Sequence, residues 1–376
     1  MKRSLQKSIQ WAFCFASILW FSYGCTAPEA ISMPATADPA PISIPTSTTT
    51  DDSSRDGLSD QEIATLSSLK KIDDYPLYTM HYIGAYDQWQ ASNLDVGLLT
   101  MSDLPNPEHA ATAPSWACSL FAAFGDPDNM LFGRNFDWDY SPAVLLFTDP
   151  PDGFASVSMV DIAYLGFGGA RVATLTDIPL VEREALLNAP FLPFDGMNEQ
   201  GLAVGMAAVP SGDMVPDPAR ETAGSLMVIR KILDQASNVD EAVDILQSYN
   251  IDMQGGPPLH YLIAAPSGGS VLVEFYHGEM VVIPNQRDWH MATNFLRASI
   301  EGSAAGMCSR YDSLNARLTE TEGQLSVQGA LDLLSDVSQV TTQWSVVYGI
   351  SSLEIEVIMG QQYDNVLTFH LSIAGD

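Results

Sequence analysis

The residues with the clearest chemical potential are a thiol, a guanidinium and a carboxylate that lie close together in the chain. Cys118 is followed by Arg134 sixteen residues later and by Asp137 nineteen residues later. A nearby cation lowers the pKa of a thiol and so favours the nucleophilic thiolate, and arginine is a permanent cation. These three residues therefore have the groups needed to form and hold a sulfur nucleophile.

The residues between the thiol and the guanidinium predict how the three groups meet. Gly125-Asp126-Pro127-Asp128-Asn129 is a dense turn signal. We therefore expect strands over Ser119–Phe124 and Met130–Phe136, joined as a hairpin. A hairpin of this length returns the guanidinium and the carboxylate to the side of the thiol.

The thiol also has a possible base within its own residue. A cysteine at a chain terminus carries an α-amine, whose reference pKa is about 7.7–8.0 and which can accept the thiol proton. Asp137 is suited to hold the resulting ammonium. This interpretation requires removal of the residues ahead of Cys118, and the bond between Ala117 and Cys118 is the expected point of cleavage.

The charge balance excludes one class of partner. The chain of 376 residues has 16 Lys and Arg against 46 Asp and Glu, a formal net charge of −30. Nucleic-acid binding is not expected, because phosphates need a cationic surface. The six histidines show no metal-ligand spacing and no phosphate-binding glycine loop is present, so we expect no metal and no cofactor.

The N-terminus is typical of an exported protein. A basic start precedes an apolar run over residues 11–21, which is too short to span a membrane. We interpret residues 1–24 as a cleaved signal peptide. Cys25 then resembles the lipid-modified cysteine of bacterial lipoproteins, which predicts a membrane-anchored protein on the cell surface or in the periplasm. Plain secretion and a retained anchor are the alternatives.

The rest of the chain divides into three expected parts. Residues 25–58 are rich in Ala, Pro, Ser and Thr, which predicts a disordered tether. Residues 59–117 form a leader, and its capping box Ser59-Asp60-Gln61-Glu62 predicts a helix through about Lys71. Residues 118–376 form the catalytic domain.

Hydrophobic periodicity predicts two groups of strands with helices between them. Strands are expected over 77–83, 201–208, 260–265, 270–276, 280–283, 344–348, 353–359 and 366–372. Helices are expected over 180–187, 225–235 and 326–337, with a further helix after an Asn238 cap. This order indicates an α+β protein with two stacked antiparallel sheets.

The segments around the three reactive residues resemble a known family. Cys118-Ser119 and Gly133-Arg134-Asn135-Phe136-Asp137-Trp138 look like the N-terminal nucleophile (Ntn) hydrolases of the choloylglycine hydrolase group, which includes bile salt hydrolases and penicillin V acylases and has acid ceramidase as a relative. Later segments match in order, at residues 196–202, 260–274, 292–294, 309–311 and 344–348. The resemblance implies a four-layer αββα sandwich.

The resemblance also implies a role for each matching residue. Cys118 would be the nucleophile and its freed amine the base. Arg134 would stabilise the thiolate, and Asp137 would orient the amine. Asn294 would donate a hydrogen bond to the developing oxyanion, and Arg310 would be the second cation of the site.

Two further positions are weaker candidates for contact with the substrate or the oxyanion. The family's second oxyanion donor lies just after the strand that begins at Gly201, but residues 206–209 offer no asparagine. Only a backbone N–H could serve there, such as that of Ala208. Asn198 belongs to the matching turn and is more typical of a structural residue.

We expect an amidohydrolase that cleaves a linear, non-peptide C–N bond in a small-molecule N-acyl amide, through a thioester on Cys118. An acyltransferase with the same thioester, and a non-catalytic surface-binding lipoprotein on the same scaffold, are the alternatives. A disulfide between Cys118 and Cys308 is also open to an exported chain. The identity of the acyl group stays open.

Overall fold

The computed structural model describes residues 57–86, 117–254 and 256–372. The expected signal peptide, Cys25 and almost all of the expected tether lie outside these residues, as do residues 87–116. No helix in the described part is long and apolar enough to cross a membrane.

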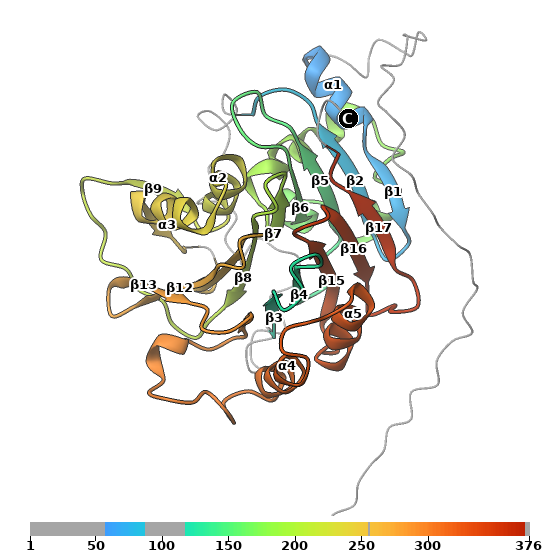
Figure 1. Cartoon of the computed structure of the whole chain (residues 1–376). Helices are drawn as coiled ribbons and strands as arrows, with labels where there is room; N and C mark the ends of the chain where they lie inside the picture. The colour runs from blue at the N-terminus through green and yellow to red at the C-terminus, as the bar shows by residue number, and fades with distance from the viewer. Residues whose placement is uncertain (1–56, 87–116, 255, 373–376) are drawn as a thin grey trace, which may run out of the picture. The chain divides into compact units, whose positions relative to one another are not determined.

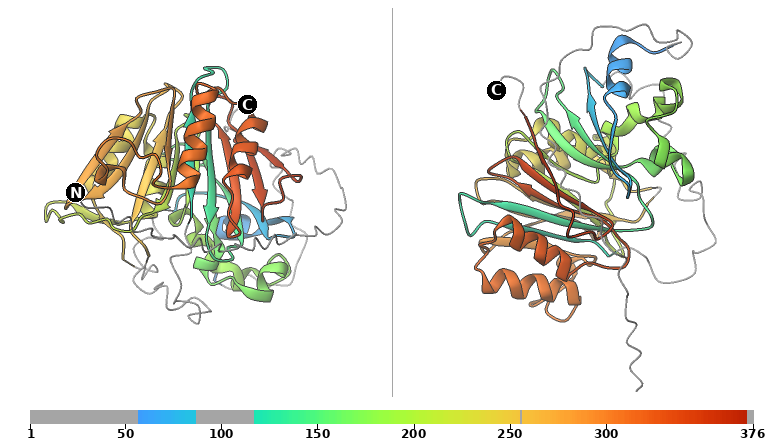
Figure 2. Two further views of the ribbon diagram at one scale, coloured as in Figure 1. Left: turned by 90° about the horizontal axis from the view of Figure 1, so that it is seen from below. Right: turned by 90° about the vertical axis from the view of Figure 1, so that its right-hand side faces the viewer.

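Two β-sheets stack against each other at the centre of the fold (Figures 1 and 2). The larger sheet has nine strands, in the order β1-β2-β5-β6-β7-β8-β11-β12-β13, and the smaller has six, in the order β14-β3-β4-β15-β16-β17. Neighbouring strands in both sheets are antiparallel, except that β2 and β5 are parallel.

The strand bounds are as follows. The larger sheet contains β1 (Lys70–Asp73), β2 (Leu77–Tyr82), β5 (Ala143–Thr148), β6 (Ser156–Asp161), β7 (Asp195–Asn198), β8 (Ala203–Ala208), β11 (Leu259–Ala264), β12 (Ser270–Tyr276) and β13 (Glu279–Pro284). The smaller contains β14 (Trp289–Ala292), β3 (Ser119–Ala123), β4 (Leu131–Asp137), β15 (Thr342–Gly349), β16 (Glu354–Met359) and β17 (Leu367–His370). A separate parallel pair is formed by β9 (Glu221–Gly224) and β10 (Tyr249–Asp252).

Helices cover the outer face of each sheet (Figure 2). The larger sheet is covered by α1 (Asp60–Ser67), the 3₁₀ helix η6 (Leu180–Phe191), α2 (Met227–Gln235) and α3 (Val239–Ser248). The smaller sheet is covered by α4 (Ser309–Glu320) and α5 (Val327–Asp336). Short 3₁₀ turns occur at η4 (Ile162–Leu165), η5 (Gly169–Thr174) and η7 (Arg297–Ser299). The layers follow the order helix, sheet, sheet, helix, which confirms the αββα sandwich.

Local capping chemistry sets several of the helix starts. Ser59 and Glu62 form the expected reciprocal capping box at α1. Asn238 Oδ1 accepts a hydrogen bond from the main chain of α3 at 3.0 Å, and Ser326 Oγ accepts one from α5 at 3.0 Å. These side chains satisfy N–H groups that have no partner within the helix.

The leader helix is shorter than its sequence predicted. We expected it to continue to about Lys71, but α1 ends at Ser67 and Lys70–Asp73 forms strand β1. Backbone pairing with β2 explains the difference, because Lys70 lies opposite Thr79. The expected helix over 180–187 is also different, since η6 is a 3₁₀ helix that contains Pro190.

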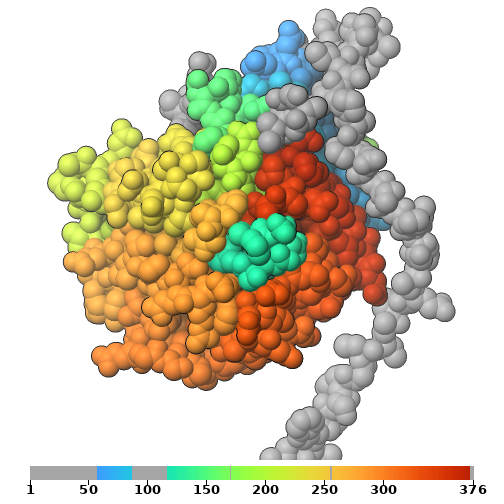
Figure 3. Space-filling model, viewed as in Figure 1, coloured from blue at the N-terminus to red at the C-terminus, as the bar shows by residue number. Residues whose placement is uncertain are grey.

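The β3–β4 hairpin forms in the register that brings the reactive residues together. Ser119 lies opposite Asn135, and Leu120 lies opposite Arg134. The hairpin is paired with β14 on one side and β15 on the other, and its turn reaches the surface between the orange and red segments in Figure 3. The strand bounds agree with the predicted hairpin to within one residue.

A glycine lets the two sheets approach closely beside this hairpin. A Cβ on Gly205 of β8 would lie 2.7 Å from Leu120 Cδ2 and 3.2 Å from the Phe132 ring. Both side chains belong to the hairpin, so a larger residue at 205 would push it away from β8. The close contact fixes the hairpin against the larger sheet.

Candidate active site

Cys118 lies immediately before β3 and packs into the interior between the sheets. Its side chain is 1% exposed. Burial raises the pKa of the thiol, while the neighbouring Arg134 guanidinium opposes that effect. Cys118 and Cys308 are both free, so the disulfide considered from the sequence is not formed.

Arg134 extends from β4 across to the larger sheet. Its Nη1 donates a hydrogen bond to the Asp195 carboxylate, and both side chains are fully buried. Asp195 also accepts a hydrogen bond from Tyr348 Oη at 2.6 Å and one from Trp344 Nε1 at 3.3 Å. Asp195 therefore fixes the cation that lies beside the thiol, and the sequence analysis did not identify it.

Asp137, the last residue of β4, has one carboxylate oxygen without a partner. Thr342 Oγ1 donates a hydrogen bond to Oδ1, whereas Oδ2 is buried with no hydrogen-bond partner among the described residues. Burial raises the pKa of this carboxyl group to about 7, against the effects of the Thr342 hydrogen bond and the Arg310 and Arg134 charges. Asp137 also acts electrostatically on the Cys118 thiol, so the oxygen without a partner among the described residues belongs to a group beside this thiol.

Arg310 binds the peptide bond at which cleavage is expected. From the first turn of α4, its Nη1 donates to the carbonyl oxygens of Ala117 and Cys118 and to Ser119 Oγ at 3.0 Å. The Ala117 carbonyl is the group that the neighbouring sulfur would attack. A cationic donor on its oxygen stabilises the negative charge that develops there during attack.

Asn294 is held between Arg310 and β8. Its Oδ1 accepts a hydrogen bond from Arg310 Nη2 at 3.0 Å, and its Nδ2 donates to the Ala208 carbonyl at 2.8 Å. The amide nitrogen has two hydrogens, so one is left for a substrate. Ala208 therefore contacts the site through its carbonyl oxygen, which accepts this hydrogen bond from Asn294. A hydrogen bond from the Ala208 N–H to an oxyanion stays a prediction.

Asn198 uses its side chain elsewhere. Its Nδ2 donates to the carbonyl oxygens of Leu233 at 3.0 Å and Ala236 at 2.7 Å. Its Oδ1 accepts from the backbone N–H groups of Gln200 and Leu202, each at 3.1 Å. These bonds join the β7–β8 turn to the end of α2 and leave no donor for an oxyanion.

Four aromatic residues near the matching motifs, Trp138, Tyr140, Phe167 and Phe191, do not gather in one pocket. Phe167 and Phe191 are buried in the cluster under α1 and η6, whereas Trp138 belongs to the cluster that contains Cys118. Tyr140 is 53% exposed. No cluster of potential metal ligands occurs within the described ranges.

A family model matches part of the chain. Residues 190–352 match the model described as acyl-coenzyme A:6-aminopenicillanic acid acyl-transferase, a stretch that includes Asp195, Asn294 and Arg310. The match covers less than half of the chain and supports the relationship inferred from the sequence, to the choloylglycine hydrolase and penicillin acylase group of Ntn hydrolases.

Two solved structures are similar in outline. A mutant of conjugated bile acid hydrolase from Clostridium perfringens has 15% sequence identity and a TM-score of 0.49, over 68% of this chain and 92% of that chain. Penicillin V acylase from Agrobacterium tumefaciens has 15% identity and a TM-score of 0.47, over 68% of this chain and 86% of that chain.

Replacing Asn198 tests whether its side chain has a structural or a catalytic role. Asn198→Ala leaves four backbone groups without their partner, so we expect the free energy of unfolding to fall by about 2–3 kcal/mol. Chemical denaturation measures this loss. Turnover per folded molecule should stay within about twofold of that of the parent protein. A variant with normal stability and lost turnover would contradict a structural role for Asn198.

The carboxyl group of Asp137 should make stability depend on pH in the uncleaved chain. Its folded pKa of about 7 lies above the usual aspartate pKa of 3.8. Between these two pH values the folded state therefore keeps a proton that the unfolded state loses. The free energy of unfolding should therefore fall from about pH 4 to pH 7 in Cys118→Ala protein.

Adding Asp137→Asn to the Cys118→Ala protein should remove this contribution. The stability difference between the two proteins should shift in favour of the Asn variant as the pH rises through that range. Chemical denaturation at several pH values measures the free energy of unfolding of both proteins. A difference between the two free energies that stays constant from pH 4 to pH 7 would rule out a raised pKa at Asp137.

Proposed function

We propose that the chain is a self-processing cysteine amidohydrolase of the Ntn type. It would cleave a linear, non-peptide C–N bond in a small N-acyl compound. The observation that carries this proposal is the buried Oδ2 of Asp137 beside Cys118, which has no hydrogen-bond partner in the described part of the chain. A new ammonium group at Cys118 would supply the hydrogen bond and positive charge that this oxygen lacks.

The proposed first reaction is cleavage of the bond before Cys118. The sulfur attacks the Ala117 carbonyl carbon, and the carbonyl oxygen gains negative charge while held by Arg310. The C–N bond then breaks, the thiol proton ends on the cysteine nitrogen, and the leader is left as a thioester. Water hydrolyses this thioester, which releases a carboxylate on Ala117 and the free Cys118 thiol.

The proposed second reaction uses the same sulfur on an external amide. The α-amine of Cys118 accepts the thiol proton, and Asp137 orients the resulting ammonium. Arg134 stabilises the thiolate, and the second hydrogen on Asn294 Nδ2 donates to the oxyanion. The amine product leaves with the proton, and water then releases the acyl group from the thioester as a carboxylate.

Acyl transfer is a second candidate function. The matched family model is described as an acyl-transferase, and an amine can replace water in the attack on the thioester. Purified protein should be assayed with N-acyl p-nitroanilides of varied acyl chain, with and without an added primary amine. Free acid as the main product supports hydrolysis, whereas a new amide that increases with amine concentration supports transfer.

We also propose that the protein is exported and tethered to a membrane by a lipid on Cys25. The basic start, the short apolar run and the small residue before Cys25 support this location. The tether of residues 25–58 would then hold the enzyme away from the lipid surface.

Replacing the nucleophile should stop both reactions. Cys118→Ala has no sulfur to attack the Ala117 carbonyl or a substrate, so the chain should stay uncut and turnover should fall to background. Mass spectrometry should find a fragment that begins at Cys118 in the parent protein alone. Full activity with the Ala117–Cys118 bond intact would disprove the processing step.

Removing the guanidinium on the scissile carbonyl should slow processing. Loss of one oxyanion donor costs about 10²–10³-fold in other enzymes, so we expect Arg310→Ala to slow cleavage by at least about 100-fold. The matched control is Arg317→Ala on the same helix, whose side chain pairs with Asp336 at the surface. Gel analysis over time after synthesis measures both, and equal rates would exclude a role for Arg310 in cleavage.

A further inference from the structure

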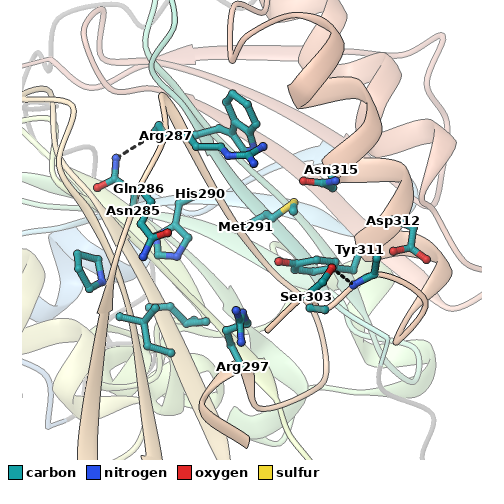
Figure 4. Close-up of a pocket in the computed structure, with 16 residues that line it drawn as sticks. Asn285, Gln286, Arg287, His290, Met291, Arg297, Ser303, Tyr311, Asp312 and Asn315 are labelled. Atoms are coloured by element: carbon teal, nitrogen blue, oxygen red, sulfur yellow. Dashed lines mark hydrogen bonds between the residues drawn. The ribbon is translucent and has the colours of Figure 1, made fainter. Parts of the chain in front are cut away.

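A second concave site lies between α4 and the strands β13 and β14 (Figure 4). The cavity has a volume of about 320 Å³, within the range of small-molecule sites. β14 runs antiparallel to β3, and the cavity lies at the Trp289 end, opposite Ala123. At about 3.4 Å per residue, this end is roughly 17 Å along the strand from Cys118. Cys118 is not among the residues that line the cavity.

Two guanidinium groups without acidic partners line this cavity. Arg287 is exposed and lies over the Trp289 ring at 5.1 Å. Arg297 donates hydrogen bonds to the carbonyl oxygens of Ile300 at 2.8 Å and Gly302 at 2.7 Å. In the part of the chain that the structure describes, neither arginine forms an ion pair. Two arginines in one cavity that form no ion pair among the described residues are notable in a chain with a net charge of −30.

The other titratable groups of the cavity do not cancel this charge. His290 is neutral, because burial lowers its pKa to about 4. Burial raises the pKa of Tyr311, and the charges of Arg297 and Arg287 oppose the rise, so its hydroxyl is protonated and close to both cations. Asp312 is the one acidic residue of the lining, and its carboxylate already accepts hydrogen bonds from Gly306 N–H at 3.0 and 3.1 Å.

The remaining walls combine apolar and amide groups. Leu272, Ile283 and Met291 supply apolar surface, and Asn285 and Asn315 also line the cavity (Figure 4). Apolar surface in the same cavity as two guanidinium groups suits a ligand with one anionic end and one apolar end. Arginine also matches the planar, two-oxygen geometry of a carboxylate.

We propose that this cavity binds a small organic carboxylate. Its charged group would lie between Arg287 and Arg297 and accept a hydrogen bond from the Tyr311 hydroxyl. Its apolar body would lie against Trp289 and Met291. The proposal is independent of activity at Cys118, although a carboxylate released there would be one source of such a ligand.

The test uses 4-fluorobenzoate as the probe and 4-fluorobenzamide as its neutral counterpart. Binding to the full-length protein is followed by ¹⁹F NMR line broadening and by calorimetry. Arg287→Gln and Arg297→Gln should each weaken benzoate binding by about tenfold or more. Arg220→Gln is the control, because this exposed arginine on another loop pairs with Asp217. Cys118→Ala protein should bind benzoate as the parent does.

Each outcome decides for or against the proposal. Benzoate binding that exceeds benzamide binding and is lost in the Arg287 and Arg297 variants supports it. Among the described residues the exposed Arg287 side chain lies over the Trp289 ring and forms no hydrogen bond or ion pair. The Arg287→Gln variant therefore tests the proposal even if Arg297→Gln disturbs the loop at 300–302. Equal binding of the two probes, unchanged binding in Arg287→Gln, or tighter binding of inorganic phosphate than of benzoate would overturn it.

Discussion

The arrangement of the site depends on a buried ion pair that joins the two sheets. Arg134 comes from the smaller sheet and Asp195 from the larger, and neither side chain is exposed to water. Removing one member of such a pair typically costs about 3–5 kcal/mol, because the other charge is left buried without a partner. Tyr348 and Trp344 add hydrogen bonds to Asp195 from a neighbouring strand, so the cation beside the thiol keeps its position only while the sheets keep their register.

The local parts of this arrangement could be predicted from the sequence. The turn at 125–129 lies between two short apolar strands, and its chemistry is enough to place Arg134 opposite Leu120. The helix starts at Ser59, Asn238 and Ser326 follow from capping residues that act within a single turn. Each of these features depends on residues that are near one another in the chain.

The other parts depend on contacts between distant residues. Asp195 is 61 residues from Arg134, and Thr342 is 205 residues from Asp137, so neither partner has a local signal. The expected continuation of the leader helix to about Lys71 was wrong for the same reason, because pairing with the distant strand β2 decides the conformation of Lys70–Asp73. Helix α4 was missed although it carries Arg310, because its apolar residues are few.

The position of β2 has a consequence for the proposed processing. This strand precedes the proposed cleavage point, yet it lies inside the larger sheet between β1 and β5, and Tyr78 and Met80 are fully buried. Cleavage at Ala117, as proposed, would leave the sheet built from two separate polypeptides. Unfolding would then release two molecules, so refolding would become a second-order association that slows on dilution, whereas the intact chain would fold at a rate independent of concentration.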